Sequence, residues 1–232
     1  NGQYVVYTWS NSYGSNTNPF TDTEDGKHYI YTDVSLDGLG AVTGDVTLTI
    51  SGTTTVGENV YGGGESSDAI GNTVVNVNGG VVSKDVYGGG ALANVDGNTE
   101  VSLSGGTING DVYGGGKGRL ESGTVGQDGY ASPIAATVGA TTVELNKDVA
   151  DGAKGCVVNG SIFGCNNLNG TPLGDVTVHV YATQNAAATR ITNVPNGDQT
   201  AKVKGRYDVK AVYGGGNLAA YIPTDLANST TN

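Results

Sequence analysis

The pentapeptide Val-Tyr-Gly-Gly-Gly occurs four times in this chain, at Val60–Gly64, Val86–Gly90, Val112–Gly116 and Val212–Gly216. A degraded copy, Ile162-Phe163-Gly164-Cys165-Asn166, lies between the third and the fourth. The aromatic residues of the first three copies are 26 positions apart, and the two later steps are 50 positions, which is one period plus 24 residues. Self-similarity at a fixed period of this length is typical of a repeat fold.

An alternating segment precedes each copy of the pentapeptide. Within each segment one parity is mostly apolar and the other mostly polar, as in Val46-Thr47-Leu48-Thr49-Ile50. This period of two predicts strands with one buried face. The predicted strands are residues 46–50, 73–77, 99–103, 141–145 and 176–180. Several of them run into a Gly-rich bend, and a second short strand then ends in Val-Tyr.

These features predict an all-β chain, a single-stranded parallel β-helix (β-solenoid) of about five coils of ~26 residues. One unit cannot bury its apolar row alone, whereas units stacked at the ~4.8 Å strand spacing pair their backbones and share one core. The glycines are expected to provide positive φ at the corners, where a Cβ would clash. The alternative is a β-sandwich of many short strands, but a sandwich does not need the same pentapeptide every 26 residues.

The chain divides into two parts by its repeats. Residues 1–40 lack the pentapeptide and hold the only Trp, Trp9. They are predicted to form an N-terminal cap or an irregular first coil, because an open solenoid end is an unpaired ladder. Residues 41–232 form the repeat domain, with long insertions near 117–140 and 181–207. A short helix is expected at Gln184–Arg190 within the second insertion.

Composition excludes several classes of protein. The 232 residues include 40 Gly, 22 acidic and only 11 basic residues, for a net charge of −11. Nucleic acid is therefore not an expected partner, since phosphate contact needs clustered Lys and Arg. No apolar run approaches ~18 residues, so the chain is not expected to be transmembrane. Residue 1 is Asn, Met is absent, and Asn228–Thr230 is similar to the opening of a repeat strand, so we expect a processed chain or a fragment of a longer parent.

The repeat unit resembles those of a known group of proteins. The stretch from Gly97 to Gly116, with Gly160–Asn167 and Gly174–Tyr181, is similar to repeats in large surface proteins of gut bacteria of the Bacteroides and Prevotella type. Such proteins are described as adhesin-like or autotransporter-like. The resemblance, over about residues 41–220, implies a secreted or cell-surface β-helix. It carries no catalytic residues to transfer, and a shared fold does not establish function.

One aromatic residue recurs at the same position of every unit. Stacking predicts a ladder of these rings, Tyr61, Tyr87, Tyr113, Phe163 and Tyr213. If the preceding Val row faces inward, the rings face outward beside glycines, where they could stack on sugar rings. The alternative is a structural ladder, either inside the core or covered by an insertion loop.

Acidic and basic candidates for catalysis lie on the outward row of the predicted strands. Glu100 and Glu144 fall on successive coils, two residues out of step, and His179 lies beside this row. A carboxylate pair is what a glycosidase needs. The alternative is that all three are ordinary surface groups.

Two further sets of residues suggest ligands or cross-links. Recurring carboxylates near strand starts are candidates for a structural Ca²⁺ site, at Asp85, Asp111, Asp175 and Asp208. The alternative is that these side chains satisfy backbone donors at bends. Cys156 and Cys165 are nine residues apart and are predicted to form a disulfide, with two small buried thiols as the alternative.

The sequence therefore predicts a non-enzymatic extracellular or cell-surface domain, a structural stalk or adhesin-like binding scaffold. Its expected partner is a glycan or protein on a host or microbial surface, bound through the aromatic ladder or the insertions. One alternative is a polysaccharide lyase or glycoside hydrolase that uses Glu100, Glu144 and His179. Another is a filament subunit that associates with itself end to end. No other cofactor is predicted.

Overall fold

The computed structural model describes residues 40–149, 155–181, 183 and 208–222, together with two strands near the N-terminus. These strands, β1 (Gln3–Trp9) and β2 (Tyr29–Ser35), pair antiparallel in a unit of their own. Whether residues 1–40 cap the repeat domain stays a prediction. The helix expected at residues 184–190, like most of the insertion near 181–207, lies outside the described residues.

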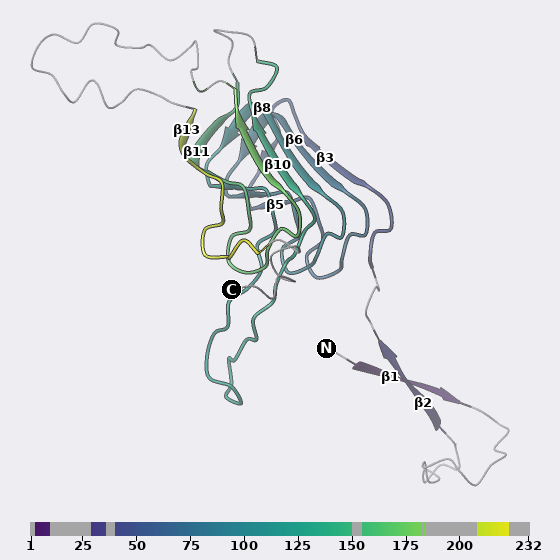
Figure 1. The fold of residues 1–232 in the computed structure, drawn as a ribbon. Helices are drawn as coiled ribbons and strands as arrows, with labels where there is room; N and C mark the ends of the chain where they lie inside the picture. The colour runs from purple at the N-terminus through teal and green to yellow at the C-terminus, as the bar shows by residue number, and fades with distance from the viewer. Residues whose placement is uncertain are drawn as a thin grey trace, which may run out of the picture. The chain divides into compact units, whose positions relative to one another are not determined.

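The repeat domain is a parallel sheet of stacked strands, so the predicted all-β parallel fold is confirmed (Figure 1). Its first row follows the predicted segments, and the strands lie side by side in the order β3 (Val46–Ile50), the first half of β6 (Thr73–Val82), the first half of β8 (Thr99–Ile108), β10 (Thr141–Leu145) and β12 (Val176–Val180). No helix long and apolar enough to cross a membrane occurs in the described part of the chain.

Two more rows of strands turn the sheet into a coil. The second row joins β4 (Thr55–Val56), the second halves of β6 and β8, and the starts of β11 (Val157–Phe163) and β13 (Val209–Tyr213). The third joins β5 (Val60–Tyr61), β7 (Val86–Tyr87), β9 (Val112–Tyr113) and the ends of β11 and β13. Equivalent residues of successive units therefore lie directly on one another, as predicted.

The inward parity of each row forms one apolar core. Val75, Val101 and Val143, which are paired in the first row, are fully buried. From the pentapeptide row, Val60, Val86, Val112 and Ile162 join the same cluster, whereas Val212 in the last copy is exposed. Strands β3 and β12, at the two ends of the first row, are more exposed than those between them because each has a neighbour on one side only.

A column of buried threonines crosses this core. The hydroxyls of Thr73, Thr99 and Thr141 donate to glycine carbonyls at the pentapeptide corner, at 2.6–2.7 Å. Each hydroxyl thus satisfies a carbonyl that strand pairing leaves free. Val176 occupies the next position of the column, and there the Cys165 thiol donates to the Gly214 carbonyl at 3.6 Å instead.

The glycines of the pentapeptide serve close packing: the predicted Cβ clash is confirmed, and the predicted positive φ is wrong for these residues. None of them has a positive φ; in the repeats that conformation belongs to bend glycines such as Gly80 and Gly106. A Cβ on Gly88 would collide with the carbonyl oxygen of Gly114 in the next coil, and one on Gly62 would collide with Gly88 in the same way. Only a residue without a side chain allows coils to stack at this corner.

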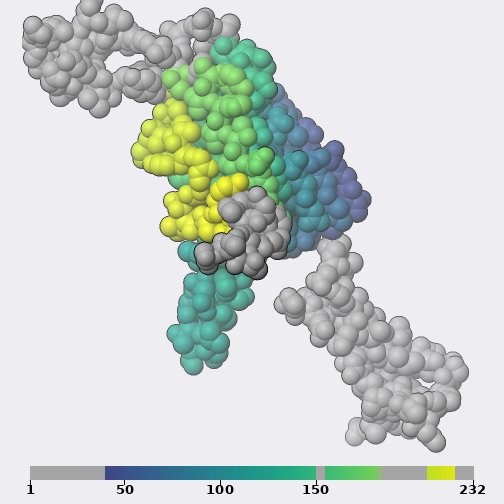
Figure 2. All heavy atoms as spheres, in the orientation of Figure 1, coloured from purple at the N-terminus to yellow at the C-terminus, as the bar shows by residue number. Residues whose placement is uncertain are grey.

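The 24 extra residues before the fourth aromatic enter at two places. Thr141 pairs with Thr99, 42 positions earlier, and Val158 pairs with Ile108, 50 positions earlier. Sixteen extra residues therefore precede β10, and eight lie between β10 and β11. Most of the first group forms an antiparallel hairpin, residues 119–134, which is bridged at Arg119–Ile134 and Ser122–Ala131 and projects from the stack as the teal segment of Figures 1 and 2.

Candidate functional site

The predicted aromatic ladder is present as a continuous stack. Successive rings from Tyr61 to Tyr213 have centroids 4.8–4.9 Å apart and interplanar angles of 7–15°. Their spacing equals that of the strands that carry them, since parallel in-register pairing fixes both. The ladder forms a cluster separate from the main core, on the opposite face of the third row from the Val column.

The middle of the ladder is closed to ligands. Tyr87 and Tyr113 are 0% and 1% exposed, and Phe163 is also buried. The Tyr87 hydroxyl donates to Asp85 Oδ2 (3.1 Å) and accepts from Asn167 Nδ2 (2.7 Å). Burial raises the pKa of both phenols above the usual 10, and the neighbouring carboxylates add to this. Sugar rings therefore cannot stack on these three residues, and the burial favours the structural alternative for them.

Only the two end rings are accessible. Tyr213 is 49% exposed and Tyr61 is half-buried. The side chain that covers Tyr87 is Asn167, which follows the pentapeptide copy two units later. Asn217 lies near the Tyr113 hydroxyl at the corresponding position, again two units later, and its Nδ2 donates to Asn167 Oδ1 (3.1 Å). The ladder is thus covered by residues far along the chain.

The recurring aspartates serve the backbone. Asp85 Oδ1 accepts the Asp111 N–H (2.9 Å), and Asp111 Oδ1 accepts the Ser161 N–H (2.7 Å). Asn59 begins this column by accepting the Asp85 N–H. Asp208 is buried, and Asp175 accepts the Thr141 N–H through its backbone carbonyl. No group of three or more His, Cys, Asp or Glu side chains suited to a metal ion occurs among the described residues, so the bend alternative explains Asp85 and Asp111.

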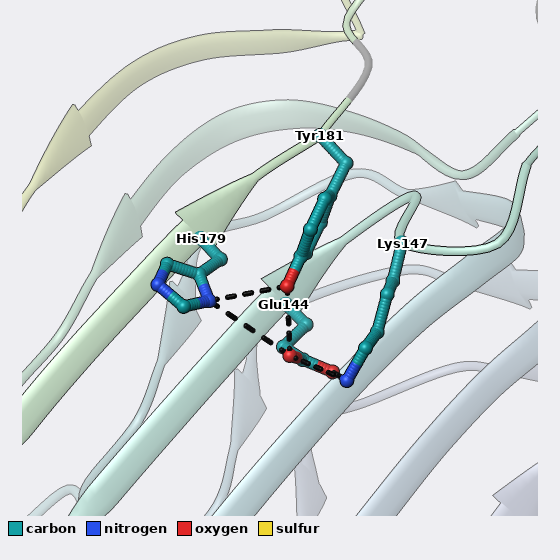
Figure 3. Close-up of polar contacts among 4 residues, drawn as sticks. All are labelled: Glu144, Lys147, His179 and Tyr181. Atoms are coloured by element: carbon teal, nitrogen blue, oxygen red, sulfur yellow. Dashed lines mark hydrogen bonds and ion pairs between the residues drawn. The ribbon is translucent and has the colours of Figure 1, made fainter.

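A cluster of polar side chains, Lys147, His179 and Tyr181, surrounds Glu144 (Figure 3). Glu144 on β10 pairs in register with His179 on β12, and the Glu144 carboxylate is 10% exposed. Lys147 Nζ contacts both carboxylate oxygens, at 2.9 and 3.0 Å, and the Tyr181 hydroxyl lies 3.2 Å from Oε1. The same hydroxyl lies 3.2 Å from His179 Nδ1, whose distance to Oε1 is 3.9 Å.

The protonation states of Tyr181, His179 and Lys147 follow from their contacts in this cluster. The Tyr181 hydroxyl has one proton, so when it donates to Glu144, His179 Nδ1–H donates to the phenol oxygen. Hydrogen bonding and charge from Glu144 raise the pKa of Lys147, which keeps the ammonium protonated. Burial, followed by the hydrogen bond to Glu144, raises the pKa of Tyr181 and keeps the phenol neutral.

The structure brings two of the three catalytic candidates together. Glu144 and His179 are neighbours, whereas Glu100 pairs with Thr142 and is exposed. Lys147 and Tyr181 were missed by the sequence reasoning. Tyr181 follows His179 by two residues. Because side chains two positions apart on a strand point to the same face, this spacing could have predicted that Tyr181 lies beside His179.

The predicted disulfide is wrong. Cys156 and Cys165 are both free and buried. Cys156 packs in the main core, while Cys165 lies at the corner and donates to the Gly214 carbonyl. Burial raises the pKa of the Cys156 thiol to about 12 and that of Cys165 to about 11. The alternative of two buried thiols is the one observed, because the strand between the residues separates them.

No family model, curated protein or solved structure matches this chain. The resemblance to bacterial surface-protein repeats therefore stays a prediction carried by the pentapeptide copies and their strands.

Proposed function

We propose that this chain is a non-enzymatic, extracellular or cell-surface scaffold that displays a hairpin to a binding partner. The observation that carries the proposal is that the repeated side chains bond one coil to the next, while the hairpin takes no part in these contacts. Tyr, Asp and Thr columns hold one coil to the next, whereas the hairpin at residues 119–134 projects beyond them (Figure 2). Rigid stacks that position variable loops are a common basis of recognition. The partner class is a glycan or protein on a host or microbial surface.

A hairpin replacement tests this function. The variant replaces residues 122–131 with Asn-Gly, which suits a two-residue hairpin turn and retains the Arg119–Ile134 bridge. We expect the melting temperature to stay within about 2 °C, since the replaced residues lie outside the core clusters. Binding to a mucin-coated surface and to a glycan array should fall at least tenfold, or about 1.4 kcal/mol. Equal binding by the variant, or no binding by the intact chain, would contradict display.

A polysaccharide-active enzyme is the second candidate, because Glu144 lies beside His179 on an outward face. The geometry of the cluster argues against it. A glycosidase needs a pair of carboxylates, but Glu100 pairs with Thr142 and is exposed, and both Glu144 oxygens are already bonded to Lys147 Nζ. Incubation with neutral and uronate-containing polysaccharides decides the question. Cleavage that Glu144→Gln abolishes while Glu100→Gln retains it would overturn the scaffold proposal.

A further inference from the structure

A pocket of about 520 Å³ lies where the aromatic ladder begins. Its lining combines the Tyr61 ring, glycine backbone, apolar side chains and charged groups, and consists of Tyr61, Gly63, Glu65, Ala91, Leu92, Lys117, Gly118, Arg119 and Leu168. Lys117, Gly118 and Arg119 form the base of the displayed hairpin. A concave site with apolar walls and a few polar groups is the usual form of a small-molecule site.

The pocket lies where Tyr61 lacks the asparagine neighbour from two units later that Tyr87 and Tyr113 have. The Tyr87 hydroxyl accepts a hydrogen bond from Asn167, which follows the pentapeptide two units later, and Asn217 lies near the Tyr113 hydroxyl at the corresponding position. The equivalent residue for Tyr61 is Lys117, which lines the pocket and does not bond to the Tyr61 hydroxyl. That hydroxyl accepts from Asn59 Nδ2 (3.0 Å). The ladder is therefore open at this ring, with Tyr87 stacked on one of its faces.

The pocket also concentrates positive charge in an acidic chain. Among the described basic residues, Lys84 and Lys147 pair with glutamates. Lys117 and Arg119 both line the pocket, and Arg119 Nε donates to the Ser132 carbonyl (3.0 Å). This bond anchors the guanidinium and leaves its two terminal nitrogens as donors. Such a pair of cations suits a carboxylate ligand, for which Arg and Lys hydrogen bonds are charge-assisted.

We propose that this pocket binds an acidic sugar residue, a pyranose that carries a carboxylate. The carboxylate lies toward Lys117 and Arg119, the ring packs against Tyr61, and Glu65 accepts hydroxyl protons. The assignment rests on the proposed binding function and gives that function a ligand class.

Calorimetric titration with trigalacturonate, sialyllactose and lactose tests the assignment. We expect at least one acidic sugar to bind and lactose not to bind. Lys117→Gln should weaken binding of the acidic sugar about tenfold without a change in melting temperature, because its side chain makes no hydrogen bond or ion pair to described residues. The matched control is Lys210→Gln, which removes the same charge from exposed β13. Failure of both acidic sugars to bind, or equal loss in both variants, overturns the assignment.

The two proposals fail separately. The hairpin replacement retains Lys117, Arg119 and the contact between Arg119 and Ser132, so the pocket persists in that variant. Loss of mucin binding in it, with no acidic-sugar binding by the intact chain, refutes the pocket and supports display. Acidic-sugar binding that Lys117→Gln weakens, together with unchanged mucin binding by the hairpin variant, supports the pocket and refutes display.

Discussion

At the residue scale, stacking at the corners depends on the absence of a side chain at glycine and on the hydrogen-bond acceptors of aspartate. Glycine is required at the first glycine of the pentapeptide because the next coil's carbonyl occupies the space of a Cβ. Asp85 is required for a different reason, since one of its oxygens accepts a backbone N–H of the next coil and the other accepts the phenol of its own. A single residue therefore joins the strand ladder to the aromatic ladder.

Gly88→Ala tests the steric requirement. The added methyl collides with the Gly114 carbonyl and lies 3.1 Å from Thr99 Cβ, so the free energy of unfolding should fall by about 3 kcal/mol. Gly214→Ala is the matched control, because the same position in the last coil has no atom within 4 Å of the new Cβ. Its stability should be unchanged or higher by up to about 1 kcal/mol. Urea unfolding measures both, and equal effects would contradict the steric account.

At the scale of the element, polar columns bind successive strands as regularly as the apolar rows. Besides the Asp85 column, two more columns of Asp and Asn oxygens accept N–H groups from the next coil, with members Asp45, Asn72 and Asn98 in one and Asp68 and Asn94 in the other. Each column satisfies donors at a bend, where strand pairing is interrupted. The Glu144 cluster has a similar effect between β10 and the end of β12.

Glu144→Gln tests whether that cluster stabilises the β10–β12 pair. The variant loses the ion pair with Lys147 and weakens the Tyr181 bond to a mostly buried carboxylate. Because Lys147 is half exposed, solvent screening limits the loss, and we expect about 1–2 kcal/mol in urea unfolding. Glu100→Gln, on the exposed face of β8, should change stability by less than about 0.5 kcal/mol. Indistinguishable variants would refute a stabilising role for the cluster.

At the scale of the whole molecule, the repeat domain keeps several titratable groups uncharged. The pKa values of Cys156, Cys165, Tyr87 and Tyr113 are all raised, chiefly by burial. Above the unfolded thiol pKa of about 9, the unfolded chain loses protons that the folded chain retains. Proton loss therefore favours unfolding. These groups leave the free energy of unfolding unchanged below about pH 9 and lower it as the pH rises further.

This linkage predicts alkaline sensitivity. The free energy of unfolding should be insensitive to these groups between pH 6 and 8 and should fall from about pH 9 toward 11, by up to about 1.4 kcal/mol per pH unit for each thiol. Urea titrations across that range measure it. In Cys156→Ala the slope between pH 9 and 11 should be smaller than in the parent chain. A flat profile in the parent chain, or fewer than two reactive thiols in denaturant without reductant, would contradict two buried free cysteines.

Sequence alone predicted the first and third rows of strands, their parallel stacking and the aromatic column, because alternation of period two and an identical corner every 26 residues favour a stack over a sandwich. The second row, which includes β4, formed where the sequence had predicted only Gly-rich bends. The sequence also marked Glu144 and His179, which share a face. Only the tertiary structure decided which rings are covered, since Asn167 reaches Tyr87 from 80 positions away. It likewise divided the extra residues between two corners and separated the cysteines. The repeat specifies which residues stack on each other in successive coils. It does not specify which side chains cover the outer face of the aromatic column, because these come from loops in coils further along the chain.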